Sequence, residues 1–117
     1  MNRQGLGRED RIRRGREFKA VFEHRRATTN GPLRVHTMPA STPHARLGLA
    51  VSRRVGNAVR RNRIKRLLRT AFRVLRDTTS QPLDVVIVVL PHELQSLNEY
   101  EKHLRKALHL AEQDAKP

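Results

Sequence analysis

Hydrophobic residues recur with helical spacing in three stretches of the chain, at residues 16–24, 57–75 and 96–111. Apolar side chains three and four positions apart share one face of a helix, which can then be buried. The pattern therefore predicts a short first helix and two longer ones. The apolar positions are Phe18, Val21 and Phe22 in the first, Ile64, Leu67, Leu68, Ala71, Phe72 and Leu75 in the second, and Leu97, Tyr100, Leu104, Ala107, Leu108 and Ala111 in the third.

Alternating and continuous apolar runs predict strands between these helices. Residues 33–38 and 47–52 alternate between two faces, and residues 39–45 between them contain two prolines. We expect these two strands to be joined as a hairpin. Residues 83–90 are dominated by Val and Ile and are followed by Pro91. This run is too short for a typical helix, so it predicts an inner strand with both faces covered.

Polar residues mark where the second and third helices begin. Asn57 can accept hydrogen bonds from the first turn of the second helix. Ser96 and Glu99 have the spacing of a capping box at the start of the third. The resulting order is helix, strands, basic helix, strand, helix, which predicts an α+β fold in which helices cover a sheet.

The length of 117 residues predicts one domain that spans the whole chain, and no internal repeat is visible. The basic, glycine-containing start, residues 1–9, is expected to be mobile, and residues 112–117 are expected to be frayed.

Positive charge is concentrated in the first two thirds of the chain. There are 25 Lys and Arg against 11 Asp and Glu, for a net charge of +14. Residues 1–76 hold 21 basic and 4 acidic side chains, whereas residues 77–117 hold 4 basic and 7 acidic ones. Residues 53–76 contain nine Arg, one Lys and no acid. The alternative interpretation of this charged run is a solvated helix face. Because the run contains cations and no acid, it favours a polyanionic partner.

Several other classes of protein are excluded or disfavoured by the composition. The chain has no cysteine, so disulfides and thiolate metal sites are excluded. Its histidines show no metal-binding spacing, and no hydrolase or phosphate-loop motif is present, so we expect no catalytic residue and no protein-bound metal. No apolar run approaches the roughly 18 residues of a membrane span, and the N-terminus does not resemble a secretory signal. We therefore expect a cytoplasmic protein without a membrane partner.

The basic helix places its polar residues on two surfaces. At about 100° per residue, one row lies opposite the apolar stripe and can meet successive phosphates. A second cluster lies near the helix N-terminus, where free N–H groups also favour an anion. The row comprises Asn62, Lys65, Arg66, Arg69, Arg73 and Arg76, and the cluster comprises Arg53, Arg54, Arg60, Arg61 and Arg63.

Phe18 and Phe22 have two possible roles. Both rings can belong to the core, or one or both can lie at the rim of a cleft where unpaired bases stack. The position of these rings on a short helix beside a sheet is compatible with either role.

The segment from Val51 to Phe72, VSRRVGNAVRRNRIKRLLRTAF, resembles the protein subunit of bacterial ribonuclease P. The triplet Arg61-Asn62-Arg63 is the signature of that family, and the resemblance extends over residues 10–111. It implies an αβββαβα fold, of the class known from the second domain of a small-subunit ribosomal protein. It also implies an additional short strand near residues 26–30 and a left-handed crossover through the basic helix, against the usual right-handed rule.

The resemblance also implies a function. Proteins of this family assist a catalytic RNA, which requires Mg²⁺ to remove the 5′ leader of precursor tRNA, and they contact that RNA and the single-stranded leader. No cofactor of the protein itself is implied, and the oligomeric state stays open. Carried over to this chain, the RNA-binding residues are Arg53, Arg54, Asn57, Arg60, Arg61, Asn62, Arg63, Lys65, Arg66, Arg69 and Arg73, and the leader cleft is formed by Phe18, Phe22, His36 and Ser52.

Two other kinds of nucleic-acid-binding protein fit the same composition. One is a structural RNA-binding protein of the ribosomal type, which would not depend on an unpaired 5′ extension. The other is a DNA-binding protein that inserts the basic helix into a major groove, although no helix precedes it with helix-turn-helix spacing.

Overall fold

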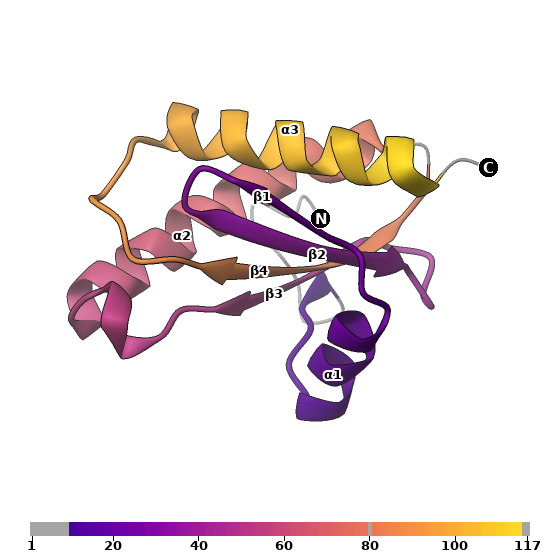
Figure 1. Cartoon of the computed structure of the whole chain (residues 1–117), viewed down its shortest axis with the longest axis horizontal. Coiled ribbons are helices and arrows are strands. Elements are labelled where there is room, and N and C mark those ends of the chain that lie inside the picture. Colours follow the sequence, from indigo (N-terminus) through magenta and orange to yellow (C-terminus); the bar gives the residue numbers. More distant parts are fainter. Residues whose placement is uncertain (1–9, 80, 116–117) are drawn as a thin grey trace, which may run out of the picture.

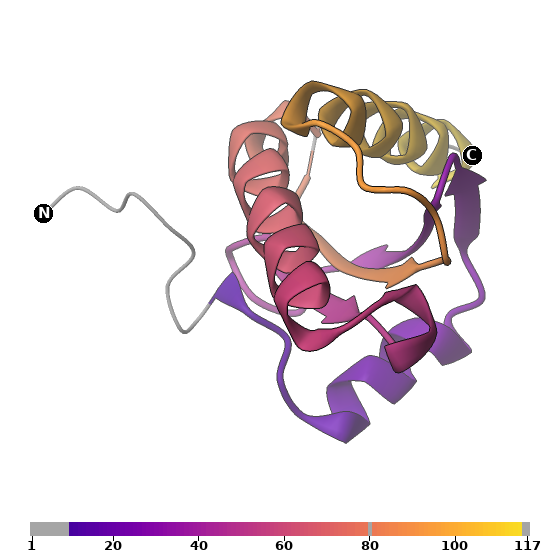
Figure 2. The ribbon, with the colours of Figure 1, turned by 90° about the vertical axis from the view of Figure 1, so that its left-hand side faces the viewer.

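The chain folds into three layers, with a mixed sheet between two helices on one face and one helix on the other (Figures 1 and 2). The structure is a computed structural model that describes residues 10–79 and 81–115. Helices α2 (Ala58–Leu75) and α3 (Leu97–Ala115) cover one face, and α1 (Gly15–Glu23) lies against the other. The element order is αβββαβα, as the resemblance implied.

The sheet has four strands in the order β1-β2-β4-β3. β1 (Ala27–Asn30) and β2 (Leu33–Pro39) form an antiparallel hairpin, so the additional strand near residues 26–30 is confirmed. β4 (Leu83–Val89) runs antiparallel to β2 and parallel to β3 (Arg46–Ala50). The inner position of β4 is confirmed. The predicted hairpin between β2 and β3 is wrong, because β4 lies between them and forms hydrogen bonds with both.

The parallel pair β3 and β4 is connected through α2, and this connection is left-handed. β3 and β4 point the same way, and α2 lies on the sheet face that is turned away in Figure 1. Two short 3-10 turns, Arg53–Val55 and Arg76–Thr78, lead into and out of α2. The crossover departs from the right-handed rule, as the resemblance implied. It places the basic helix α2 on the same face of the sheet as α3, opposite α1.

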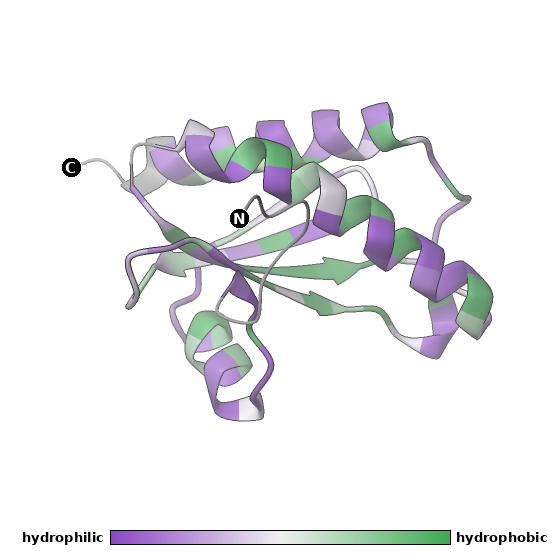
Figure 3. Cartoon of the chain, turned by 180° about the vertical axis from the view of Figure 1, so that it is seen from behind, coloured by the Kyte–Doolittle hydropathy of each residue, from purple (hydrophilic) through white to green (hydrophobic). Residues whose placement is uncertain are grey.

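The sheet separates a large core from a small one. Leu33, Val35 and Val85 face α2 and α3, where they pack with the buried stripes of both helices. The smaller core under α1 contains Val21 and Val86. Figure 3 shows β3 and β4 mostly in the colour of hydrophobic residues. Helix α2, which lies in front of them in this view, carries both hydrophobic and hydrophilic residues. Since successive strand residues point to opposite faces, the apolar run of β4 supplies both cores.

The predicted helix starts are confirmed. The side-chain oxygen of Asn57 accepts from the backbone N–H of Arg60 at 2.9 Å. Ser96 Oγ accepts from the N–H of Glu99, and Glu99 Oε1 accepts from the N–H of Ser96. Helix α3 extends to Ala115, through part of the segment expected to be frayed. Residues 1–9 and 116–117, which were expected to be mobile or frayed, lie outside the described residues.

Candidate RNA interface

The outward side of α2 carries the predicted row of polar residues. Asn62 and Arg66 of this row are exposed, and so is Arg63 of the cluster near the helix N-terminus. Lys65, Arg69 and Arg73 are half-buried, and so is Arg76 beyond the helix end. Arg76 forms an ion pair with Asp10 at 3.3 Å, which removes it from the row as a free cation. The row is therefore shorter at its C-terminal end than the helical spacing predicted.

The residues at the start of α2 are partly used to hold the helix in place. The Arg60 guanidinium donates to the backbone carbonyl of His92 at 2.6 Å, which ties α2 to the loop before α3. Arg61 Nε donates to the carbonyl of Gly56 at 3.1 Å. The Asn57 side chain caps the helix. Arg53 and Arg54 are exposed in the preceding 3-10 turn, so they and Arg63 form an exposed cationic surface at this end.

On the opposite face of the sheet, Phe18 packs directly over a glycine. A Cβ atom on Gly48 would lie 2.8 Å from the Phe18 ring, closer than real Cβ atoms approach. Gly48, Val86 and His36 form one row across β3, β4 and β2. Helix α1 covers this row, and Phe18 is half-buried there, with its ring in the smaller core.

Phe22 lies at the exposed end of that row. Phe22 is 38% exposed, and its ring packs edge to face with the His36 ring, with centroids 4.7 Å apart. His36 Nδ1 is buried without a hydrogen-bond partner among the described residues. Burial, followed by the positive charge of Arg34, lowers the pKa of His36, so the imidazole is held neutral. Phe22 is thus an exposed aromatic residue beside a neutral imidazole.

One row of the sheet next to α1 is partly exposed in the described part of the chain. Arg34 on β2 and Ala50 on β3 both pair with Val88 on β4, so these three form the neighbouring row on the same face. Arg34 is exposed, and Ala50 and Val88 are half-buried. Ser52 follows β3 and is also exposed. We call the row Arg34, Val88 and Ala50, with Phe22 and Ser52 at its borders, the open strip.

An ion-pair network fixes α1 above the sheet. Arg46 on β3 donates from Nε and Nη2 to the two carboxylate oxygens of Asp84 on β4, at 3.0 and 2.8 Å. Its Nη1 donates to Glu17 Oε2 of α1 at 2.8 Å. The hydrogen bond from Arg46 is the main cause that lowers the pKa of Glu17. The network therefore sets where Phe18 and Phe22 stand relative to the open strip.

A cavity of about 260 Å³ lies between the start of the described chain, α1, β3 and α2. Lys65, Arg69 and Phe18 in its wall were predicted as site residues, whereas Arg11 and Arg13 were not. The sequence signal that could have identified Arg11 and Arg13 is their alternation about the apolar residue Ile12, which is typical of an extended segment at a sheet edge. The residues that line the cavity are Arg11, Ile12, Arg13, Phe18, Leu47, Leu49, Lys65 and Arg69.

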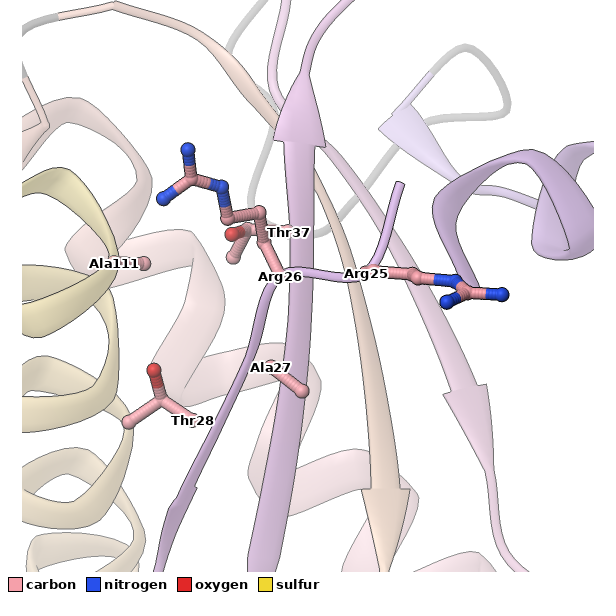
Figure 4. A pocket seen from close by; sticks show the side chains of 6 residues that line it. All are labelled: Arg25, Arg26, Ala27, Thr28, Thr37 and Ala111. Atoms are coloured by element: carbon pink, nitrogen blue, oxygen red, sulfur yellow. The ribbon is translucent and has the colours of Figure 1, made fainter. Parts of the chain in front are cut away.

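A second hollow, of about 320 Å³, lies between β1 and α3 (Figure 4). Its charged lining residues are Arg25 and Arg26, whose side chains extend in different directions. Thr28 and Thr37 supply hydroxyl groups, but the two guanidinium groups do not converge on one point. This hollow is therefore a weaker candidate for an anion than the cavity beside α2.

Neither a metal centre nor a membrane span is found in the described part of the chain. Residues 10–79 and 81–115 contain no group of three His, Asp or Glu side chains placed to hold a metal ion. Within the same residues, every helix is too short or too polar to traverse a bilayer.

Comparisons with known proteins point to one family. The sequence model of the family described as Ribonuclease P matches residues 6–112. The Ribonuclease P protein component of Exiguobacterium sp. is 43% identical over 83 residues, which cover 71% of this chain and 72% of that protein. The protein of the same name from Desulfovibrio desulfuricans is 41% identical over 102 residues, with 86% and 78% covered.

Solved structures give the same result. The ribonuclease P protein of Staphylococcus aureus superposes with a TM-score of 0.76 at 28% identity, covering 87% of this chain and 94% of that one. The protein from Thermotoga maritima gives 0.71 at 25% identity, covering 88% and 96%. The matches extend across α1, the sheet, α2 and α3. This chain belongs to the ribonuclease P protein family and is the protein component of that endoribonuclease ribonucleoprotein.

Proposed function

We propose that this chain binds the catalytic RNA of ribonuclease P through α2 and holds the single-stranded 5′ leader of precursor tRNA on the open strip. The observation that carries this proposal is the open strip itself. An exposed aromatic ring, Phe22, borders a half-buried apolar row that ends in the cation Arg34. Stacking surfaces next to cations bind single-stranded nucleic acid with little dependence on sequence.

The exposed residues of α2 and of the turn before it supply the contact with folded RNA. Asn62, Arg63 and Arg66 face outward, and Arg53 and Arg54 extend this surface toward the open strip. Guanidinium groups bind phosphate oxygens in pairs, and such contacts fix position without reading sequence. Bound in this way, the protein would place the leader and the catalytic RNA on adjoining surfaces of one domain.

In this proposal the hydrolysis belongs to the RNA. The RNA supplies the cleavage site and the Mg²⁺ ions that the reaction needs, and the protein binds and orients the substrate. The contribution of the protein is electrostatic and stacking affinity for a substrate that still carries its leader. The protein therefore raises cleavage most where Mg²⁺ alone shields the RNA phosphates poorly.

The proposed function is tested by the cleavage rate of a leader-bearing precursor tRNA at low millimolar Mg²⁺. Reactions contain bacterial ribonuclease P RNA, the protein, or both. We expect cleavage to be stimulated only when the two are combined. Binding of RNA without stimulation would instead favour a structural RNA-binding role.

The α2 contact is tested by Arg66→Ala combined with Arg69→Ala. Each lost phosphate contact lowers the slope of log affinity against log salt by about 0.7 to 0.9. The matched control is Arg105→Ala combined with Lys106→Ala, which removes the same charge from exposed positions on α3. An unchanged slope in the α2 variant would show that this face does not contact RNA.

The open strip is tested by Phe22→Ala. We expect weaker binding of leader-bearing precursor, by about 1–3 kcal/mol per stacked base, and unchanged binding of mature tRNA. Leu110→Ala is the matched control, because Leu110 is 40% exposed against 38% for Phe22. Equal losses for the two RNAs, together with a lower melting temperature, would assign Phe22 to the core.

A further inference from the structure

The cavity beside α2 gathers four cations from parts of the chain that are far apart in sequence. Arg11 and Arg13 come from the segment before α1, and Lys65 and Arg69 come from neighbouring turns of α2. Figure 2 shows this segment running past α2 before it turns under the sheet. We call the cavity the Arg11–Arg69 pocket.

Within the described part of the chain, no carboxylate is among the lining residues of the Arg11–Arg69 pocket. Among residues 10–79 and 81–115, the acids nearest along the chain are engaged elsewhere, with Asp10 on Arg76 and Glu17 on Arg46. Arg69 is half-buried, and its pKa is lowered first by burial and then by the charge of Arg11. Cations placed together in a partly dry site repel one another, and a bound anion relieves that repulsion.

The segment that carries Arg11 and Arg13 is held in place by the sheet. The N–H of Ile12 donates to the carbonyl of Leu47 at 2.9 Å, and Arg11 forms an isolated parallel bridge with Leu47. The Ile12 side chain is only 4% exposed. In an extended segment the residues on either side of Ile12 point to the opposite face. Arg11 and Arg13 are therefore positioned before any ligand binds, which lowers the entropy that binding would cost.

The other walls of the Arg11–Arg69 pocket are apolar. Phe18, Leu47 and Leu49 line it beneath the cations. Its volume of about 260 Å³ is below the roughly 300–1,000 Å³ of typical small-molecule sites. A phosphate with part of its nucleotide matches this size and this combination of charge and apolar surface. Arginine also suits such a ligand, because its planar donors pair with phosphate oxygens.

We propose that the Arg11–Arg69 pocket binds one phosphate group of RNA, with Arg11 and Arg13 as ligands in addition to Lys65 and Arg69. This inference rests on the proposed function, because it requires RNA as the partner. The phosphate comes from the catalytic RNA or from the precursor leader, and the two sources share the same chemistry. Phe18 stands between the pocket and the sheet face under α1, so the ring contributes to both surfaces.

The test compares the variant Arg11→Ala/Arg13→Ala with the control Arg105→Ala/Lys106→Ala. Both remove two positive charges, but the control residues are exposed on α3. Affinity is measured over a range of salt concentrations for isolated ribonuclease P RNA, and for leader-bearing precursor bound to the assembled holoenzyme. We expect the pocket variant to lose about tenfold in affinity for one of the two RNAs. Its salt slope should fall by about 0.7 to 0.9 relative to the control.

Each outcome has a defined meaning. A loss with the isolated ribonuclease P RNA assigns the phosphate to the catalytic RNA, and a loss confined to the precursor assigns it to the leader. If the pocket variant loses no more affinity than the control for either RNA, the pocket proposal is overturned. The proposed function would still stand in that case if the unaltered protein stimulates cleavage. Failure of the unaltered protein to bind and stimulate the RNA would overturn the proposed function itself.

A second measurement on the unaltered protein covers the case in which the variant does not fold. Phenylglyoxal modifies accessible arginines, and both Arg11 and Arg13 are exposed in the free protein. Binding of ribonuclease P RNA or of the precursor should protect these two residues at least tenfold more than Arg105. Equal reactivity with and without RNA at Arg11 and Arg13 would overturn the pocket proposal.

Discussion

Replacing Arg46 with methionine should lower the free energy of unfolding by about 3–5 kcal/mol, because it leaves a buried carboxylate without its partner. Asp84 is 0% exposed and accepts two hydrogen bonds from Arg46, at 3.0 and 2.8 Å. Glu17 also loses a hydrogen bond, but its side chain is 28% exposed, so this second loss is small. Methionine keeps much of the apolar stem of Arg46, so the loss is mainly electrostatic.

For a domain of 117 residues, this change corresponds to a melting temperature lower by about 10–20 °C. The assay is urea unfolding followed by far-ultraviolet circular dichroism, with Arg34→Met as the control, because Arg34 is exposed on the same face of the sheet. The control should stay within about 0.5 kcal/mol of the unaltered protein. Adding Asp84→Leu to Arg46→Met should restore most of the stability, since no charge is then buried. A loss below about 1 kcal/mol for Arg46→Met alone would refute this account of the network.

Three further predictions concern single residues near the candidate interface. Gly48→Ala should lower the free energy of unfolding by about 1–3 kcal/mol, measured by urea unfolding, because the added methyl group would displace the Phe18 ring. Asn57→Ala should cost about 1 kcal/mol of unfolding free energy through loss of the helix cap; no change would show that the cap is dispensable. The pKa of His36 is lower in the folded protein than in the unfolded chain, so as pH falls the unfolded chain binds a proton on this imidazole before the folded protein does. The free energy of unfolding therefore declines as pH falls through about 6.5. His36→Phe should reduce that decline, as measured by urea midpoints at about pH 7.5 and about pH 5.5, and an equal decline in both proteins would contradict it.

The helices and the basic face of the candidate site could be predicted because their causes are local. The stripe from Ile64 to Leu75 repeats with the period of a helix, and Asn57 lies directly before it. Such patterns depend on neighbours within one or two turns, which are neighbours in the sequence as well. The same holds for the capping residues of α3 and for the strand character of residues 83–90, where β-branched side chains dominate.

Strand order could not be predicted in this way, because it depends on which segments meet after the chain has turned back. The residues of β2 and β3 alternate as a hairpin would, yet β4 lies between them and buries both of its faces. The hydrogen-bond partners of individual side chains could not be predicted either. Arg60 resembles its neighbouring cations in the sequence, but in the structure it donates to the carbonyl of His92, 32 residues away.

The α+β fold and its strongly basic helix could be recognised from the sequence alone, because periodicity and charge are properties of adjacent residues. The surroundings of that helix depend on contacts between distant segments. The contact between Ile12 and Leu47 brings Arg11 and Arg13 to Lys65 and Arg69, and the network around Arg46 places α1 so that one row of the sheet stays open. These arrangements arise from hydrogen bonds and packing between segments distant along the chain, whose energies depend on the fold as a whole.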